Sequence, residues 1–157
     1  MFGKKKQVLT KDEIAMVEQA IKAAELKSAG EIVVRIVMDS KQFQKDDVDA
    51  DQAVHLRALD EFEKCGIVQT EGATGVMLFL SVAEKRVEVL ADKAINEKVE
   101  HVVWEDIVAT IVEGFKANAP GKGIAKGVDQ AGTLLSKHFP RADDDVNELS
   151  DEVKISD

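Results

Sequence analysis

The chain of 157 residues has one cysteine, two prolines, one tryptophan and no tyrosine. The single cysteine, Cys65, excludes an intramolecular disulfide and any zinc site built on a cysteine cluster. The longest unbroken apolar run, residues 76–80, is far shorter than the roughly 20 residues that span a bilayer. No apolar segment of the kind found in secretory signals follows the lysine cluster at residues 4–6. Because both targeting signals are missing, we expect a cytoplasmic protein without a transmembrane segment.

Positive charge is also scarce, since 21 Lys and Arg stand against 30 Asp and Glu, for a net charge of −9. This balance argues against nucleic acid and anionic membranes as partners, because both bind through basic side chains. Residues 141–157 hold seven acids and two bases, or −5, which leaves −4 for residues 1–140. We therefore expect one domain over 1–140 and an acidic tail over 141–157. The tail also has apolar residues, which leaves open whether it docks on the domain or on a partner.

Apolar spacing predicts helices alternating with strands. A capping box at Thr10 and Glu13 marks the start of the first helix. The link at 82–85 is short enough for an antiparallel hairpin, whereas the first two strands are joined through a helix and should be parallel. These connections predict an α/β sandwich with a mixed sheet. The expected helices cover about residues 11–27, 48–64, 99–115 and 124–135, and the expected strands residues 31–38, 75–81 and 86–91.

The sequence contains no strong enzyme motif, such as a nucleophile elbow, a Walker loop or a zinc-protease motif. The stretch Gly121-Lys122-Gly123 follows a helix and lacks the Walker spacing, which favours a helix-joining turn over an anion site. An EF-hand beginning at Asp47 fails because Gln52 and Ala58 stand where that loop needs glycine and a bidentate acid. Other polar or unusual side chains are expected to have structural roles: His55 and His138 at the rim of the core, His101 in solvent, and Cys65 and Trp104 in apolar surroundings.

Strand direction brings two acidic residues together. If the third strand runs antiparallel to the first two, its end lies at the edge where they begin, so Asp92 meets Glu31 and the segment around Thr70. Carboxylate, hydroxyl and carbonyl oxygens suit Ca²⁺ or Mg²⁺, which makes Glu31, Asp92 and Thr70 candidate metal ligands. In the alternative interpretation, Asp92 only caps the following helix and Glu31 begins its strand in solvent.

Several motifs occur in an order that resembles the TPM domain family, which is named partly after a thylakoid-lumen phosphatase associated with photosystem II repair. The likeness covers nearly the whole chain. Two glycines of the family's Gly-Asp-x-Gly-Ile pattern are replaced here by Ala91 and Ala94, and an Arg-Asn pair by Ala73-Thr74. The matching segments are Ser28-Ala29-Gly30-Glu31-Ile32, Phe62-Glu63-Lys64-Cys65-Gly66-Ile67, Gly75-Val76-Met77-Leu78, Ala91-Asp92-Lys93-Ala94-Ile95, His138-Phe139-Pro140 and Asn147-Glu148-Leu149-Ser150-Asp151-Glu152.

The resemblance implies a three-layer α/β/α sandwich and, for some members, divalent-metal binding and phosphatase activity. It supports two hypotheses about function. The first is a non-enzymatic module that binds Ca²⁺ or Mg²⁺ and a protein partner, in the setting of membrane-protein maintenance. The alternative is a metal-dependent phosphatase acting on phosphomonoesters. For the alternative, no residue can be assigned a catalytic role from the sequence, because no general base or phosphate-binding arginine adjoins the site. Arg35 lies about 13 Å along its strand from Glu31.

Overall fold

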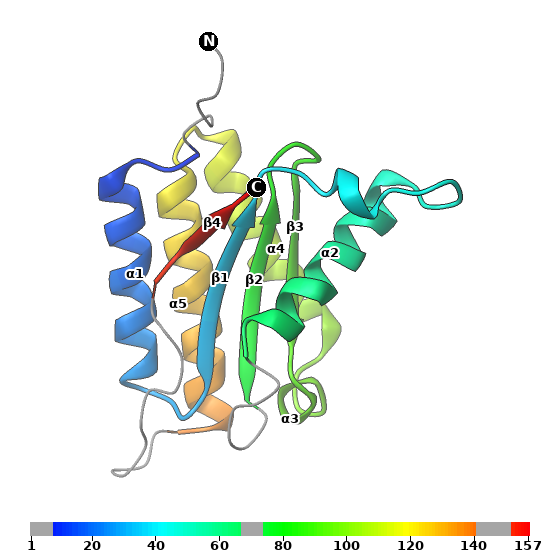
Figure 1. Cartoon of the computed structure of the whole chain (residues 1–157). Helices are drawn as coiled ribbons and strands as arrows, with labels where there is room; N and C mark the ends of the chain where they lie inside the picture. The colour runs from blue at the N-terminus through cyan, green and yellow to red at the C-terminus, as the bar shows by residue number, and fades with distance from the viewer. Residues whose placement is uncertain (1–7, 67–73, 141–151) are drawn as a thin grey trace.

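The structure, a computed structural model, describes residues 8–66, 74–140 and 152–157. In these residues a four-stranded sheet is covered by helices on both faces (Figure 1). The helices are α1 (Lys11–Glu25), α2 (Ala50–Lys64), α3 (Lys93–Asn96), α4 (His101–Lys116) and α5 (Pro120–His138), with a 3₁₀ helix η1 at Lys41–Phe43, and the strands are β1 (Glu31–Val37), β2 (Gly75–Ser81), β3 (Arg86–Ala91) and β4 (Lys154–Ser156).

The strand order is β3-β2-β1-β4. β1 runs parallel to β2 and to β4, while β2 and β3 form an antiparallel pair. The predicted hairpin and the predicted parallel crossover are therefore both confirmed. β2 is buried over its whole length because it lies between two strands and between two layers of helices. Its continuous apolar sequence is typical of a strand covered on both faces.

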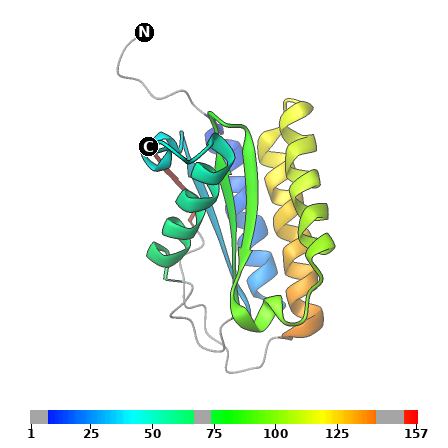
Figure 2. The same ribbon diagram turned by 90° about the vertical axis from the view of Figure 1, so that its right-hand side faces the viewer.

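The two faces of the sheet carry separate cores. Ile32, Val34 and Ile36 of β1 pack with apolar side chains of α1, α4 and α5, whereas Val33 and Val37 face α2 and pack with Phe79. This division follows from the period of two along a strand, which sends successive side chains to opposite faces. Figure 2 shows the two layers on either side of the sheet, so the predicted three-layer α/β/α sandwich is confirmed.

One carboxylate joins the N-terminal ends of two long helices. The capping box predicted for α1 is present, since Glu13 Oε1 accepts from the Thr10 N–H at 3.0 Å. Glu13 Oε2 accepts from the Gly121 N–H of α5 at 2.8 Å, and α5 has no capping side chain at its own N-cap, Ala119. These backbone hydrogen bonds lower the pKa of Glu13 from its ordinary value of 4.5, because they favour the ionised carboxylate.

We expect Glu13→Gln to lower the free energy of unfolding by about 1 kcal/mol at neutral pH, because the amide has one acceptor oxygen where the carboxylate has two. The folded pKa of Glu13 lies below its unfolded value, so its contribution is full above about pH 4.5 and falls as the pH drops through the folded pKa. Urea unfolding at pH 7 and pH 3 measures both effects. The difference in the free energy of unfolding between the parent and Glu13→Gln should be smaller at pH 3 than at pH 7. Asp12→Asn in the same turn serves as the control. A gap that widens in acid would contradict this role.

The acidic tail contributes a strand that the sequence analysis did not predict. β4 pairs with Arg35, Ile36 and Val37 of β1. The Met38 N–H donates to the Ser156 carbonyl at 3.0 Å, and the Val153 N–H donates to Glu18 Oε2 of α1 at 3.0 Å. β4 has three residues and lies more than a hundred residues after β1 in the chain, so no local pattern predicts it. It covers the edge of β1 that would otherwise be open.

Candidate functional site

The start of β1 and the end of β3 lie at the same edge of the sheet. Glu31 stands opposite Gly75 in the register of β1 and β2. The Asp92 N–H donates to the Gly75 carbonyl at 2.9 Å, which places Asp92 on the other side of the same glycine. Two strand spacings separate Glu31 from Asp92, about 10 Å between Cα atoms. Gly75 has no side chain, so nothing on β2 at this position stands between the two carboxylates. Thr70, the third residue of the predicted site, lies outside the described residues.

Asp92 caps a helix with one carboxylate oxygen, and its other oxygen has no hydrogen-bond partner among the described residues. It is the N-cap of the short helix α3, and its Oδ1 accepts from the Lys93 N–H at 2.8 Å. Its Oδ2 is buried and has no hydrogen-bond partner among the described residues. A buried carboxylate oxygen without a partner is costly, which makes it a candidate ligand atom. The capping role and the ligand role therefore use different oxygens of one side chain.

Glu31 does not begin its strand in solvent, because only 3% of its surface is exposed. Its N–H donates to the Thr74 carbonyl at 3.2 Å, which ties the start of β1 to the start of β2. The expectation of a solvated strand start is therefore wrong. β2 flanks Glu31 on one side, whereas β4 pairs only with the far end of β1 and does not reach it.

A third buried acid, Glu25, is close in sequence and was not singled out by the sequence analysis. Glu25 is 4% exposed, and its Oε1 accepts from the Ile32 N–H at 3.3 Å. β4 pairs only with the far end of β1, so this carboxylate takes the place of a neighbouring strand. A signal was present in the sequence, because Glu25 follows Ile21 by four residues and so lies on the buried face of α1.

The ligand set at this edge is incomplete within the described part of the chain. No group of three His, Cys, Asp or Glu side chains that could hold a metal ion occurs in residues 8–66, 74–140 and 152–157. Glu31 and Asp92 therefore supply at most two side-chain ligands. Ca²⁺ and Mg²⁺ accept backbone carbonyls and water as further ligands, so the donor chemistry fits either ion.

The other polar side chains considered above have ordinary structural roles. His55 Nδ1 lies 2.7 Å from Glu88 Oε1 of β3, and His101 pairs with Glu105 along α4 at 3.7 Å. Trp104 is buried in the core as predicted. Asp49 caps α2 in a capping box with Gln52.

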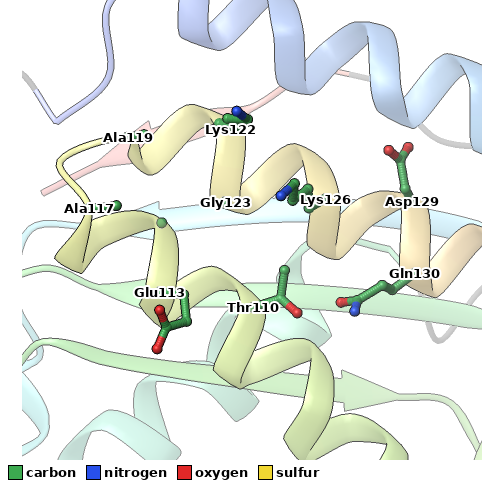
Figure 3. Close-up of a pocket in the computed structure, with 10 residues that line it drawn as sticks. Thr110, Glu113, Ala117, Ala119, Lys122, Gly123, Lys126, Asp129 and Gln130 are labelled. Carbon is green, nitrogen blue, oxygen red and sulfur yellow. The ribbon is translucent and has the colours of Figure 1, made fainter.

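A groove of about 700 Å³ lies on the outer surface between α4 and α5 (Figure 3). Its charged side chains have both signs: Lys122 and Lys126 are matched by Glu113 and Asp129. Each of these four side chains is exposed. The mixed charge and the exposure give no preference for a cation or an anion, so this groove is a weaker candidate than the acidic edge.

The stretch Gly121-Lys122-Gly123 was predicted as a helix-joining turn, but it lies within the first turn of α5, and the link to α4 is residues 117–119. Its glycines permit close packing against neighbouring helices. A Cβ atom on Gly121 would lie 2.5 Å from Glu13 Cβ of α1, and a Cβ atom on Gly123 would lie 2.7 Å from Gly114 Cα of α4. The glycines thus serve the packing of three helices.

These features define a small α/β/α domain with an acidic sheet edge. The chain belongs to the TPM domain family, whose model matches residues 4–134. The NMR structure of BA42 from the psychrophilic bacterium Bizionia argentinensis is similar, with a TM-score of 0.80 and 29% sequence identity over 97% of this chain and 98% of that one. The N-terminal domain of a protein from P. gingivalis shares the fold, with a TM-score of 0.59 and 16% identity over 84% of this chain and 79% of that one. No protein with a curated description matches the sequence.

Among the described helices, none combines the length and the apolar composition needed to cross a bilayer.

Proposed function

We propose that this TPM domain binds a divalent cation, Ca²⁺ or Mg²⁺, at the acidic edge and acts as a non-enzymatic interaction module. The buried Oδ2 of Asp92, which has no partner among the described residues, is the observation that carries the proposal. Glu31 stands beside it across Gly75 and supplies a second carboxylate. A bound cation would offset the cost of burying these oxygens and would hold the ends of three neighbouring strands together.

Membrane-protein maintenance is the setting that the family resemblance suggests for such a module. The alternative, phosphomonoester hydrolysis, calls for groups that hold the phosphate beside the metal. The three arginines in the described residues lie toward the opposite end of the sheet. Arg86 pairs with Ser81 at the end of β2, Arg35 lies in the half of β1 that pairs with β4, and Arg57 contacts Asp39 beyond the end of β1. This arrangement favours binding over catalysis.

Titration with CaCl₂ and MgCl₂ tests the proposal, using calorimetry and ¹⁵N NMR. We expect shifts at the amides of Glu31, Gly75 and Asp92, and an affinity lowered about tenfold or more by Asp92→Asn, because ligand charge largely sets affinity for these ions. Asparagine still caps a helix, so this variant should fold. Asp49→Asn is the matched control, since Asp49 caps α2 in the same way, and it should bind like the parent.

No response at these amides at about 10 mM of either ion, well above the weakest usual Kd of ~10⁻³ M, would overturn the metal site. A phosphomonoester assay with p-nitrophenyl phosphate tests the other half of the proposal. We expect no metal-dependent hydrolysis above background. Hydrolysis that Asp92→Asn abolishes would instead establish the phosphatase.

A further inference from the structure

A second cavity, of about 480 Å³, lies between the tip of the β2–β3 hairpin and the C-terminal half of α4. Its walls are mainly aliphatic, with Phe115 of α4 as the aromatic member, and Phe115 is 37% exposed. Its lining also contains three basic residues, on the hairpin and at the end of α4. The apolar lining residues are Leu80, Val82, Val87, Val112 and Phe115, and the basic ones are Lys85, Arg86 and Lys116.

The cavity adjoins a free strand edge. β3 is the last strand of the sheet, and no described strand pairs with its outer side. Figure 2 shows this edge facing the viewer between α2 and the layer of α4 and α5. In an antiparallel pair, residues alternate between bonding to the partner strand and pointing away from it. Asp92 bonds to Gly75 of β2, so Leu90, Glu88 and Arg86 also bond inward.

The intervening residues of β3, Val87, Val89 and Ala91, therefore direct their N–H and C=O groups outward, although the Ala91 carbonyl already accepts from Asn96 Nδ2 at 2.8 Å. Their side chains pack with the core on the α4 face of the sheet, the face on which the cavity opens. A strand added to this edge would place every second side chain on the same face, next to Val87. One extended ligand can therefore pair with the outward backbone groups of β3 and place a side chain in the apolar cavity.

The opposite face of β3 is already engaged. Arg86 pairs with Asp51 of α2 at 2.6 Å, and Glu88 lies 2.7 Å from His55 of the same helix. On the cavity side, by contrast, neither Lys85 nor Lys116 forms an ion pair with a described residue. A chain with a net charge of −9 therefore presents two available cations beside an apolar cavity and a free strand edge.

We propose that the β3 edge binds an extended peptide in which one large apolar residue is flanked, two positions to either side, by acidic residues. The backbone of the peptide pairs with Val87, Val89 and the N–H of Ala91, its apolar side chain enters the cavity, and its carboxylates lie near Lys85 and Lys116. This mode of binding names the partner class for the interaction role proposed above and rests on that role. It uses neither Glu31 nor Asp92.

The probe is the fluorescein-labelled heptapeptide Ser-Asp-Thr-Leu-Thr-Asp-Ser, titrated in buffer with EDTA so that the metal site plays no part. We expect saturable binding by fluorescence anisotropy, with ¹⁵N shifts centred on Val87, Val89 and Ala91. N-methylation of the peptide leucine removes the N–H that pairs with β3 and should weaken binding about tenfold or more, as should replacing both aspartates by lysine.

Two variants test the surface from the protein side. Val89→Pro removes an outward N–H without breaking a bond to β2, so it should fold and lose binding about tenfold. Lys116→Glu should weaken binding by reversing a charge beside the cavity, whereas Lys122→Glu on α5 is the matched control and should leave it unchanged.

Three outcomes would overturn the proposal: no shifts at millimolar peptide, equal binding of the N-methylated peptide, or equal binding by Lys116→Glu. Decanoate is the comparison for a small apolar anion. If it binds in the cavity and the peptide does not, the cavity is a lipid-type site and strand addition is wrong. Failure of the peptide in EDTA leaves the calcium and magnesium titration unaffected, so the two proposals fail separately.

Discussion

Replacing Gly123 with alanine is expected to lower the free energy of unfolding by about 3 kcal/mol, although Gly→Ala stabilises an ordinary helix by up to ~1 kcal/mol. The reversal comes from the contact between α4 and α5. A Cβ atom on Gly123 would lie 2.7 Å from Gly114 Cα and 3.1 Å from the Ile111 carbonyl oxygen. Both are backbone atoms, so the helices must separate to admit the methyl group. Urea unfolding followed by circular dichroism measures the loss.

Gly114→Ala meets the same contact from the other helix, because its Cβ would lie 2.5 Å from Gly123 Cα. The double variant should lose clearly less free energy of unfolding than the two single variants lose together. Helices that are already pushed apart accommodate the second methyl group more easily. Gly127→Ala provides a graded comparison, as its Cβ would meet side-chain atoms of Ile111 and Ile107, which can move. Lys122→Ala on the exposed face of α5 should change stability by less than about 0.5 kcal/mol. Neutral or stabilising behaviour of Gly123→Ala would contradict this packing.

The helix and strand starts that rest on local chemistry could be predicted from the sequence. The Thr10 and Glu13 capping box fixed the start of α1, and the hairpin between β2 and β3 followed from a short link between two apolar runs. Both features depend on residues a few positions apart, where geometry leaves few choices. The other end of α1 was predicted less accurately, since the helix stops at Glu25 and not at about residue 27.

Features that depend on distant residues could not be predicted in this way. The sequence shows that Gly123 belongs to a glycine-containing segment, but not that Gly114 of another helix packs against it. The pairing of β4 with β1 likewise has no local signal, because three residues with one clear apolar member, Ile155, do not define a strand. Such contacts are products of the packed fold.

The position of the candidate site could be predicted from the sequence, but the burial and hydrogen bonding of its carboxylates could not. Strand direction alone brings Glu31 and Asp92 to one edge, because an antiparallel third strand must end where the first two begin. The burial of Glu31, and the lack of a partner for Asp92 Oδ2 among the described residues, depend on what packs around them. Burial of this kind cannot be read from spacing, and it is the property that turns two acids into a candidate ligand pair.

A second large effect is expected at Arg57, whose replacement by alanine should lower the free energy of unfolding by about 3 kcal/mol. Its side chain is 10% exposed and lies 3.4 Å from Glu61 Oε2, itself on a side chain only 11% exposed. The guanidinium also donates to the carbonyl oxygens of Asp39 at 3.3 Å and Asp157 at 2.8 Å. The variant therefore leaves a buried carboxylate without its cation and removes one donor from each of two main-chain oxygens.

Equilibrium unfolding of Arg57→Ala, Glu61→Ala and the double variant separates the ion pair from the other contacts. The double variant should be more stable than the sum of the single losses predicts, because it removes both charges together. Arg57→Lys is the matched control for charge. It keeps the cation beside Glu61 but lacks the planar fork that reaches both carbonyls, so we expect it to recover only part of the loss. Full recovery by lysine would show that the carbonyl contacts contribute nothing.

The contact with Asp157 links this arginine to the strand that covers β1. Removing residues 152–157 deletes β4 and one of the acceptors of Arg57 together. If Arg57 holds the tail in place, Arg57→Ala should cost less in the shortened chain than in the full one, and in the full chain it should increase hydrogen exchange at Met38, whose N–H bonds to Ser156. Equal costs in both chains, with Met38 still protected, would mean that β4 docks through its apolar side chains alone. The prediction is therefore that the docking of β4 on the sheet depends on one buried cation, Arg57 of α2.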